Sequence, residues 1–392
     1  MNKKAIIILA AIFLLIVGTL GFLIYSRSSS TEEQPPVVVD STNTLPDPVD
    51  QTTPPLPPPE KFALLTQAGE QVVSPALFYN GNGVTYLNTQ GQLMKADFET
   101  SVEGGQTLAR SRNLDIQQKS NIARILWPKN GDDFIAESED SVGNKSYSYF
   151  NFSTGAYLDL PKEVTALEWL PSGDKIIFVW VAKDADGNEK ATLNIANPDT
   201  SGYSQIAELY ESDDALYLSP DGLNLVFHRA KNTGSVNKII QTTPDGKIWK
   251  DLVKEGYNYG ILWSPDSQKL LFGKLDRSGL GYQLWYYDLY SGEVKNLGLS
   301  TVPLKAVWGS DSRTVYAAAP NGGQAIRDYA DLNNTFTADT FYKIDTSTLE
   351  KTEYLPENLT VDGRDLFLNP GEDKVFFRNA QDGGLYYLDL TQ

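Results

Sequence analysis

From residue 61 onward, apolar and polar residues alternate in short runs separated by turn residues, which is the pattern of half-buried β-strands. The stretch LWSPDSQKLLF, residues 262–272, shows one such unit, because an apolar run enters a Ser-Pro-Asp-Ser turn and leaves it as a second strand at 269–275. Further strands are expected at 282–289 and 294–299. Four strands joined by short turns predict an antiparallel meander.

Similar units recur along the chain. The stretches LEWLPSGDKIIF, LYLSPDGLNLVF and LFLNPGEDKVFF end at Phe178, Phe227 and Phe377. The turns recur roughly 45 residues apart, which is the period of four-stranded propeller blades and not of helical solenoids. We therefore predict an all-β fold, a seven-bladed β-propeller over residues 61–392; six or eight blades remain open because the first two units are weak. The equivalent turn positions are read as Gly83, Gly131, Gly173, Gly222, Ser267, Ser312 and Glu372.

The two ends of this region complement each other. The last unit supplies only three expected strands, and the segment KFALLT, residues 61–66, stands alone before the first full unit. We predict that 61–66 pairs with 385–390 and closes the ring, since closure removes the open sheet edges that promote aggregation.

The repeats also carry a family resemblance. The signatures WSPD-S-x-x-L-x-F at 263–272 and LSPDG-x-x-L-x-F at 218–227, with the strand YQLWYYDL at 282–289, resemble the TolB-type propeller repeats, also called WD-repeat-like. The resemblance implies a β-propeller and no single activity, because such repeats occur in envelope scaffolds and as accessory domains of hydrolases. The ring of Asp and His hydrogen bonds found in true WD repeats has no counterpart in these motifs.

The N-terminal segment has a different character. Residues 5–25 are uncharged and apolar, and at ~1.5 Å per residue they span a ~30 Å hydrocarbon core as a single transmembrane helix. Lys3 and Lys4 precede this span, so residues 1–4 are expected in the cytoplasm and the rest of the chain outside it. Residues 26–60 are proline-rich and are expected to form a disordered linker. A cleaved signal peptide is the alternative to this signal anchor.

Composition narrows the function. The formal net charge is -17, which disfavours nucleic acid as a partner. The chain has no cysteine and one histidine, His228, so neither a Cys-ligated metal nor an H-E-x-x-H zinc site is present, and no cofactor is expected. The acidic loop 184–189 offers oxygens at alternate positions; a polar hairpin is the simpler interpretation, with calcium as the alternative.

The clearest irregularity is the long insertion 319–340 in the sixth unit. Long structured loops in compact domains are often functional, and Arg327, Asp328 and Tyr329 are the candidate binding residues there. We expect a membrane-anchored, extracytoplasmic, non-catalytic propeller that binds a protein or an envelope polymer. The alternative is a glycan-acting enzyme that uses a carboxylate pair near the propeller axis.

Overall fold

The chain divides into two compact units, Met1–Pro58 and Pro59–Gln392, and the described residues all belong to the second. The expected span 5–25 and linker 26–60 lie outside them. No helix among the described residues has the length and apolarity to cross a membrane. The computed structural model describes residues 62–64, 70–78, 81–100, 106–108, 111–114, 116–119, 121–141, 143–209, 214–229, 238–247, 249–253, 258–275, 281–321, 325–326, 332, 335–354 and 360–391.

The second unit consists of seven antiparallel sheets, named blades 1 to 7 in the order of their first strands. Blade 1 contains β2 (Val72–Leu77), β3 (Gly83–Asn88), β4 (Leu93–Thr100) and β5 (Gln106–Leu108), and β6 (Arg112–Asn113) pairs with β4. Blade 2 contains β7 (Ile122–Leu126), β8 (Phe134–Glu139), β9 (Lys145–Asn151) and β10 (Ala156–Asp159). Blade 3 contains β11 (Val164–Trp169), β12 (Ile176–Lys183), β13 (Glu189–Ala196) and β14 (Ser204–Leu209).

The remaining four blades follow the same order along the chain. Blade 4 contains β15 (Asp214–Leu218), β16 (Leu225–Arg229), β17 (Ile239–Thr242) and β18 (Trp249–Val253). Blade 5 contains β19 (Asn258–Trp263), β20 (Lys269–Leu275), β21 (Tyr282–Asp288) and β22 (Val294–Asn296). Blade 6 contains β23 (Ala306–Trp308), β24 (Thr314–Pro320), β25 (Asp339–Asp345) and β26 (Lys351–Tyr354), after the short 3-10 helix η1 (Pro303–Lys305). Blade 7 contains β27 (Gly363–Leu368), β28 (Lys374–Asn379), β29 (Leu385–Asp389) and β1 (Phe62–Leu64).

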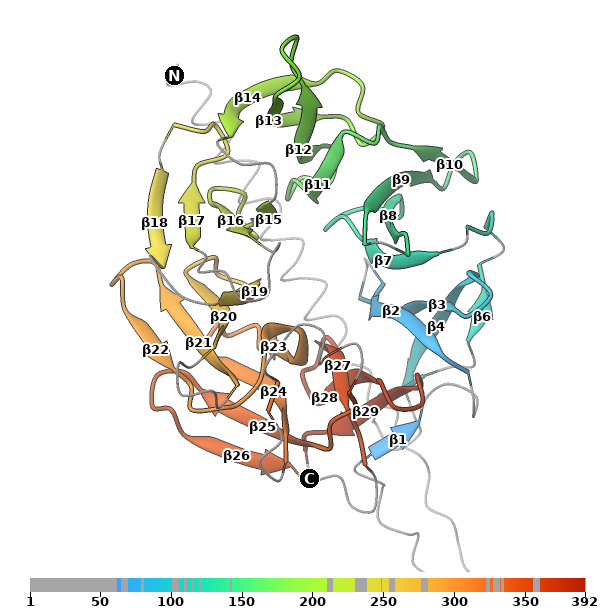
Figure 1. Cartoon of the computed structure of the whole chain (residues 1–392). Coiled ribbons are helices and arrows are strands. Elements are labelled where there is room, and N and C mark those ends of the chain that lie inside the picture. The colour runs from blue at the N-terminus through green and yellow to red at the C-terminus, as the bar shows by residue number, and fades with distance from the viewer. Residues whose placement is uncertain are drawn as a thin grey trace, which may run out of the picture. The chain divides into compact units, whose positions relative to one another are not determined.

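The blades form a closed ring, so the prediction of an all-β seven-bladed propeller is confirmed. Figure 1 shows the first strands β2, β7, β11, β15, β19, β23 and β27 innermost, and strands or η1 at each junction contact the neighbouring blade. The predicted closure is also confirmed, because β1 pairs antiparallel with β29 and Phe62 lies opposite Leu388. The two ends of the propeller therefore share blade 7.

The turn after the first strand of a blade ends in a left-handed residue. The residues predicted for this position in blades 2 to 7 all have positive φ, including Ser267 at 62° and Ser312 at 54°. Serine at this position adds a hydrogen bond that glycine cannot make, because its hydroxyl accepts from the previous blade. Asp221 N–H donates to Ser267 Oγ at 3.0 Å, and Asp266 N–H donates to Ser312 Oγ at 2.9 Å.

Blade 1 corrects one alignment. The residue with positive φ there is Gly81, at 69°, whereas Gly83 is the first residue of β3. Gly81 N–H donates to Phe78 O and Phe78 N–H to Gly83 O, which matches the bonds around the Gly173 turn. The proline of the motif is missing from this turn, so the sequence alone placed it two residues late.

Tryptophans join neighbouring first strands. The Nε1–H groups of Trp169, Trp263 and Trp308 donate to the carbonyls of Leu126, Tyr217 and Leu262 at 2.9, 3.2 and 3.2 Å. The motif phenylalanines lie in the core: Phe178, Phe227, Phe272 and Phe377 are all at most 2% exposed. Burial of each such side chain contributes about 1.5–3 kcal/mol.

Candidate functional site

The predicted binding residues Arg327, Asp328 and Tyr329 lie outside the described residues, so their role stays a prediction. Two described residues of the same insertion are held against the ring. Ile326 O accepts a hydrogen bond from Tyr282 N–H at 2.7 Å, and Leu332 O accepts one from Arg364 Nη1. The insertion connects β24 to β25, on the face opposite the first turns of the blades.

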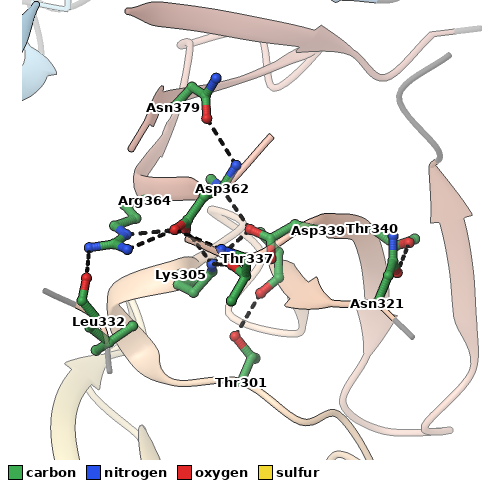
Figure 2. A network of polar contacts seen from close by, with 12 residues as sticks. Thr301, Lys305, Asn321, Leu332, Thr337, Asp339, Thr340, Asp362, Arg364 and Asn379 are labelled. Atoms are coloured by element: carbon green, nitrogen blue, oxygen red, sulfur yellow. Dashed lines mark hydrogen bonds and ion pairs between the residues drawn. The ribbon is translucent and has the colours of Figure 1, made fainter. Parts of the chain in front are cut away.

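A fully buried charge network includes the end of this insertion, at the junction of blades 6 and 7 (Figure 2). Lys305 Nζ is 2.6 Å from Asp362 Oδ1 and 2.7 Å from Asp339 Oδ2. It also donates to Thr337 Oγ1 at 2.8 Å. Arg364 Nη2 pairs with Asp362 Oδ2 at 2.7 Å. Two cations therefore balance two carboxylates, and the side chains of Lys305, Asp339 and Asp362 are 0% exposed.

Burial and charge compete in this network. Burial opposes ionisation of Asp362, but Arg364 and Lys305 outweigh it and lower the pKa of that carboxyl. For Asp339, burial dominates and raises the pKa, while Lys305 opposes the rise. Because the network is closed to solvent among the described residues, it cannot receive a substrate directly. Its position fits a structural role, in which it joins η1, β25 and β27.

A second charge cluster, open to solvent, lies on blade 2. Arg124 on the innermost strand β7 reaches Glu137 Oε2 on β8 with its Nη2 at 3.3 Å. Lys145 on β9 reaches the other oxygen of Glu137 at 2.8 Å. The side chains of Arg124 and Lys145 are 48% and 47% exposed, whereas that of Glu137 is 6% exposed. Two cations thus share one buried carboxylate, and about half of each cationic side chain stays exposed.

Glu168 on β11 completes what we call the axial cluster: Arg124, Glu137, Lys145 and Glu168. Burial raises the pKa of Glu168 to about 7, and nearby Arg124 opposes this rise while the Glu137 carboxylate adds to it. The Glu168 side chain is only half-buried and makes no hydrogen bond or ion pair with the described residues. It is therefore a carboxyl that can both release and accept a proton near neutral pH.

Desolvation and nearby carboxylates act in opposite directions on Arg124. Desolvation is the largest influence on its pKa and lowers it, yet the carboxylates of Glu137 and Glu168 outweigh it and raise the pKa. The side chain is nonetheless 48% exposed, so solvent reaches it. Arg124 and Glu168 lie on β7 and β11, which are the innermost strands of blades 2 and 3 (Figure 1).

Two tyrosines border the cluster. Tyr147 on β9 is buried and donates from its hydroxyl to Thr165 O at 3.2 Å. Burial and the Glu137 carboxylate raise the pKa of Tyr147, so it stays protonated. Tyr217 on β15 lies near enough to Arg124 to influence its pKa. Arg124, Glu168 and Tyr217 thus come from the first strands of blades 2, 3 and 4.

Sequence reasoning missed the axial cluster. A carboxylate pair near the axis was only the alternative there, without named residues, because Glu137 and Glu168 lie on different blades. A signal existed: Glu168 occupies the position before the turn tryptophan, where the aligned residue of blade 5 is Leu262 and that of blade 6 is Val307. A charged residue at a position that is apolar in other blades indicates that this side chain has a role other than packing.

The other candidates lie in a hairpin turn and in a strand. The acidic loop 184–189 is the hairpin turn between β12 and β13, and Asp184 Oδ1 accepts from the N–H groups of Asp186 and Asn188 at 2.9 and 3.0 Å. His228 lies in β16 opposite Ala215 and Ile239. Among the described residues, no three Asp, Glu or His side chains gather in a way that could hold a metal ion.

Comparisons with known proteins support the fold. No family model and no curated protein matches the sequence. An oligogalacturonate lyase in complex with manganese superposes with a TM-score of 0.61 at 11% identity, covering 84% of this chain and 93% of that one. An oligogalacturonate lyase from Vibrio parahaemolyticus gives a TM-score of 0.59 at 10% identity, covering 84% and 94%. The propeller architecture implied by the repeats is therefore supported, without a match to the TolB or WD-repeat families.

The same comparison corrects the expected function. We expected a non-catalytic module that binds a protein or an envelope polymer, but the two similar solved structures described above are oligogalacturonate lyases, which act on glycans. The alternative, a glycan-acting enzyme with carboxylates near the propeller axis, agrees better with this finding. The repeat motif misled the interpretation because it reports the packing of blades, which scaffolds and enzymes share.

Proposed function

We propose that this protein is a glycan-acting enzyme that cleaves a uronate-containing oligosaccharide at the axial cluster. The observation that carries this proposal is the position of Glu168, a carboxyl without a partner among the described residues, near Arg124 on an innermost strand of the neighbouring blade. The similarity to two oligogalacturonate lyases supports an acidic glycan as the substrate class. The cations of the cluster suit a ligand that carries carboxylates.

The reaction that suits this site is a β-elimination. The Glu168 carboxylate removes the proton from the sugar carbon next to the uronate carboxylate, and the C–H electron pair forms a double bond to the neighbouring ring carbon. The bond from that carbon to the glycosidic oxygen breaks, and the oxygen takes the electron pair. Protonated Glu168 can then return the proton to this oxygen, so that atoms and charge balance. A group with a pKa of about 7 suits both roles.

The experiment is an elimination assay with galacturonate oligosaccharides, in which the conjugated double bond of the product is followed by its ultraviolet absorbance. The wild-type protein should release unsaturated product, and Glu168→Gln should reduce kcat by ~100-fold or more. Glu350→Gln is the matched control, because Glu350 is an exposed glutamate on the β25–β26 turn. Equal rates for wild type and Glu168→Gln would refute the role of Glu168, and no cleavage of any uronate-containing glycan would refute the function.

Two finer assignments belong with this proposal. We propose that the repeats are of the TolB type, on the strength of the motifs at 218–227 and 263–272. We also propose that residues 5–25 hold the protein in the cell membrane with residues 26–392 outside the cytoplasm, on the strength of the apolar run and the preceding lysines. An enzyme in that position would meet glycans of the cell surroundings.

A further inference from the structure

Elimination next to a carboxylate needs a positive charge at that carboxylate. Removing the adjacent proton pushes negative charge onto the carboxylate oxygens, and a cation fixed beside them stabilises that charge. A bound divalent metal ion and a forked arginine can both supply it. One of the similar solved structures is a complex with manganese, so it matters which of the two this chain provides.

The residues of this chain do not fit a manganese site at the axis. Manganese prefers carboxylate, carbonyl, water and imidazole ligands. The chain has one histidine and no cysteine. The described residues hold no cluster of three possible side-chain ligands. The buried Glu137 carboxylate is the best oxygen donor of the axial cluster, but Arg124 and Lys145 already occupy both of its oxygens.

Arg124 has the geometry for the task. Its contact with Glu137 uses Nη2 at 3.3 Å, and a guanidinium has five N–H donors in one plane. The side chain lies on an innermost strand and is 48% exposed, so the donors not used by Glu137 are accessible to a ligand. The ion pair with Glu137 orients the guanidinium group of Arg124, and Lys145 Nζ in turn holds the Glu137 carboxylate at 2.8 Å.

We propose that Arg124 binds and neutralises the uronate carboxylate of the substrate through its free guanidinium edge, and that no divalent cation takes part in this contact. This inference rests on the proposed function. It assigns Arg124 as the residue that selects acidic over neutral sugars, with Glu137 and Lys145 as its positioning residues. A carboxylate bound here also lies near Glu168, which favours proton transfer from the carbon between them.

The test measures binding, by calorimetry, with galacturonate trisaccharide and its fully methyl-esterified form as probes. The proteins are the full chain in detergent as wild type, Glu168→Gln to prevent turnover, and Glu168→Gln combined with Arg124→Gln or Arg124→Lys. The control combines Glu168→Gln with Arg313→Gln, because Arg313 is 56% exposed and paired with a single carboxylate, as Arg124 is. Each titration is repeated with EDTA and with added manganese.

The expected results follow from a charge-assisted contact. Arg124→Gln should weaken binding of the acid by ~10- to 100-fold and leave the ester unchanged, while Arg124→Lys recovers part of the affinity. EDTA and manganese should change nothing. Loss of binding in EDTA that manganese restores would overturn the inference and leave the proposed function standing. An unchanged affinity in Arg124→Gln would overturn it too.

The two failures remain distinguishable. If neither probe binds to any variant while the wild-type protein also fails to cleave uronate-containing glycans, the proposed function itself is wrong. If Arg124→Gln does not fold, judged by its thermal transition against that of the Arg313→Gln control, the Arg124→Lys variant and the preference for acid over ester decide the matter. The assignment is rejected if Arg124→Lys keeps the affinity that the protein with Arg124 has for both probes, and if that protein binds the acid no better than the ester.

Discussion

The raised pKa of Glu168 makes a prediction about stability that needs no substrate. The carboxyl binds its proton more tightly in the folded protein, where its pKa is about 7, than in the unfolded chain, where it has the ordinary glutamate pKa of 4.5. The folded state therefore holds more protons between these values, and stability must fall as the pH rises through this window. Glu168→Gln removes the titration and should remove this loss.

The size of the effect follows from the two pKa values. Moving from about pH 5 to about pH 8 should cost the wild-type protein on the order of 2–3 kcal/mol through this one group. Because Glu168 is half-buried, solvent screening makes this an upper estimate. The Glu168→Gln variant should be nearly equal to wild type at the lower pH and more stable at the higher pH. Chemical denaturation at both values gives the four free energies of unfolding.

The control again is Glu350→Gln, at an exposed site. Its difference from wild type should be the same at both pH values. If Glu168→Gln shows an equally constant difference, then Glu168 titrates as it does in the unfolded chain, and the argument for proton transfer in the axial cluster loses its basis. A variant that is less stable only at high pH would refute it more strongly, because that result requires a carboxylate that stabilises the fold.

Three further predictions concern other parts of the chain. Lys305→Met should destabilise the protein by about 3–5 kcal/mol in denaturant, because it leaves two buried carboxylates with one cation; the exposed Lys247→Met serves as control, and a loss below ~1 kcal/mol would contradict the network's role. A protein that begins at residue 59 should remain monomeric in light scattering. One that begins at residue 66 lacks β1 and should associate through the open edge of β29. If both proteins are monomeric, the closure argument is wrong. The full chain should stay with membranes after an alkaline wash and lose this property without residues 1–58; release of the full chain would contradict the anchor.

The sequence predicted the architecture because its signals are local. A turn such as Ser264–Ser267 fixes its own geometry, and the phenylalanine that follows it reports the core of its own blade. The closing pair of β1 and β29 was also predictable, since the last unit had only three expected strands and the segment 61–66 stood alone before the first unit. The turn of blade 1 was misplaced where the local signal, the motif proline, is missing.

The site was less predictable because it is not local. Arg124 and Glu168 come from different blades and meet only when blades 2 and 3 pack against each other. Alternation along a strand tells which side chains share a face, but not which of them reach the axis. The buried network had an even weaker signal, because Lys305 and Asp362 lie in connections between strands, and Asp339 begins β25 directly after the long insertion, whose conformation no repeat specifies. The role expected for Arg327, Asp328 and Tyr329 remains a prediction.

The shared blade also sets the order in which the protein can finish folding. The strand β1 is synthesised near the start of the propeller, yet its partner β29 follows about 330 residues later, so the first strand waits for almost the whole domain. Until then the growing chain carries an unpaired edge on each side of an incomplete ring. The last step of folding therefore brings the newest part of the propeller back to its first strand.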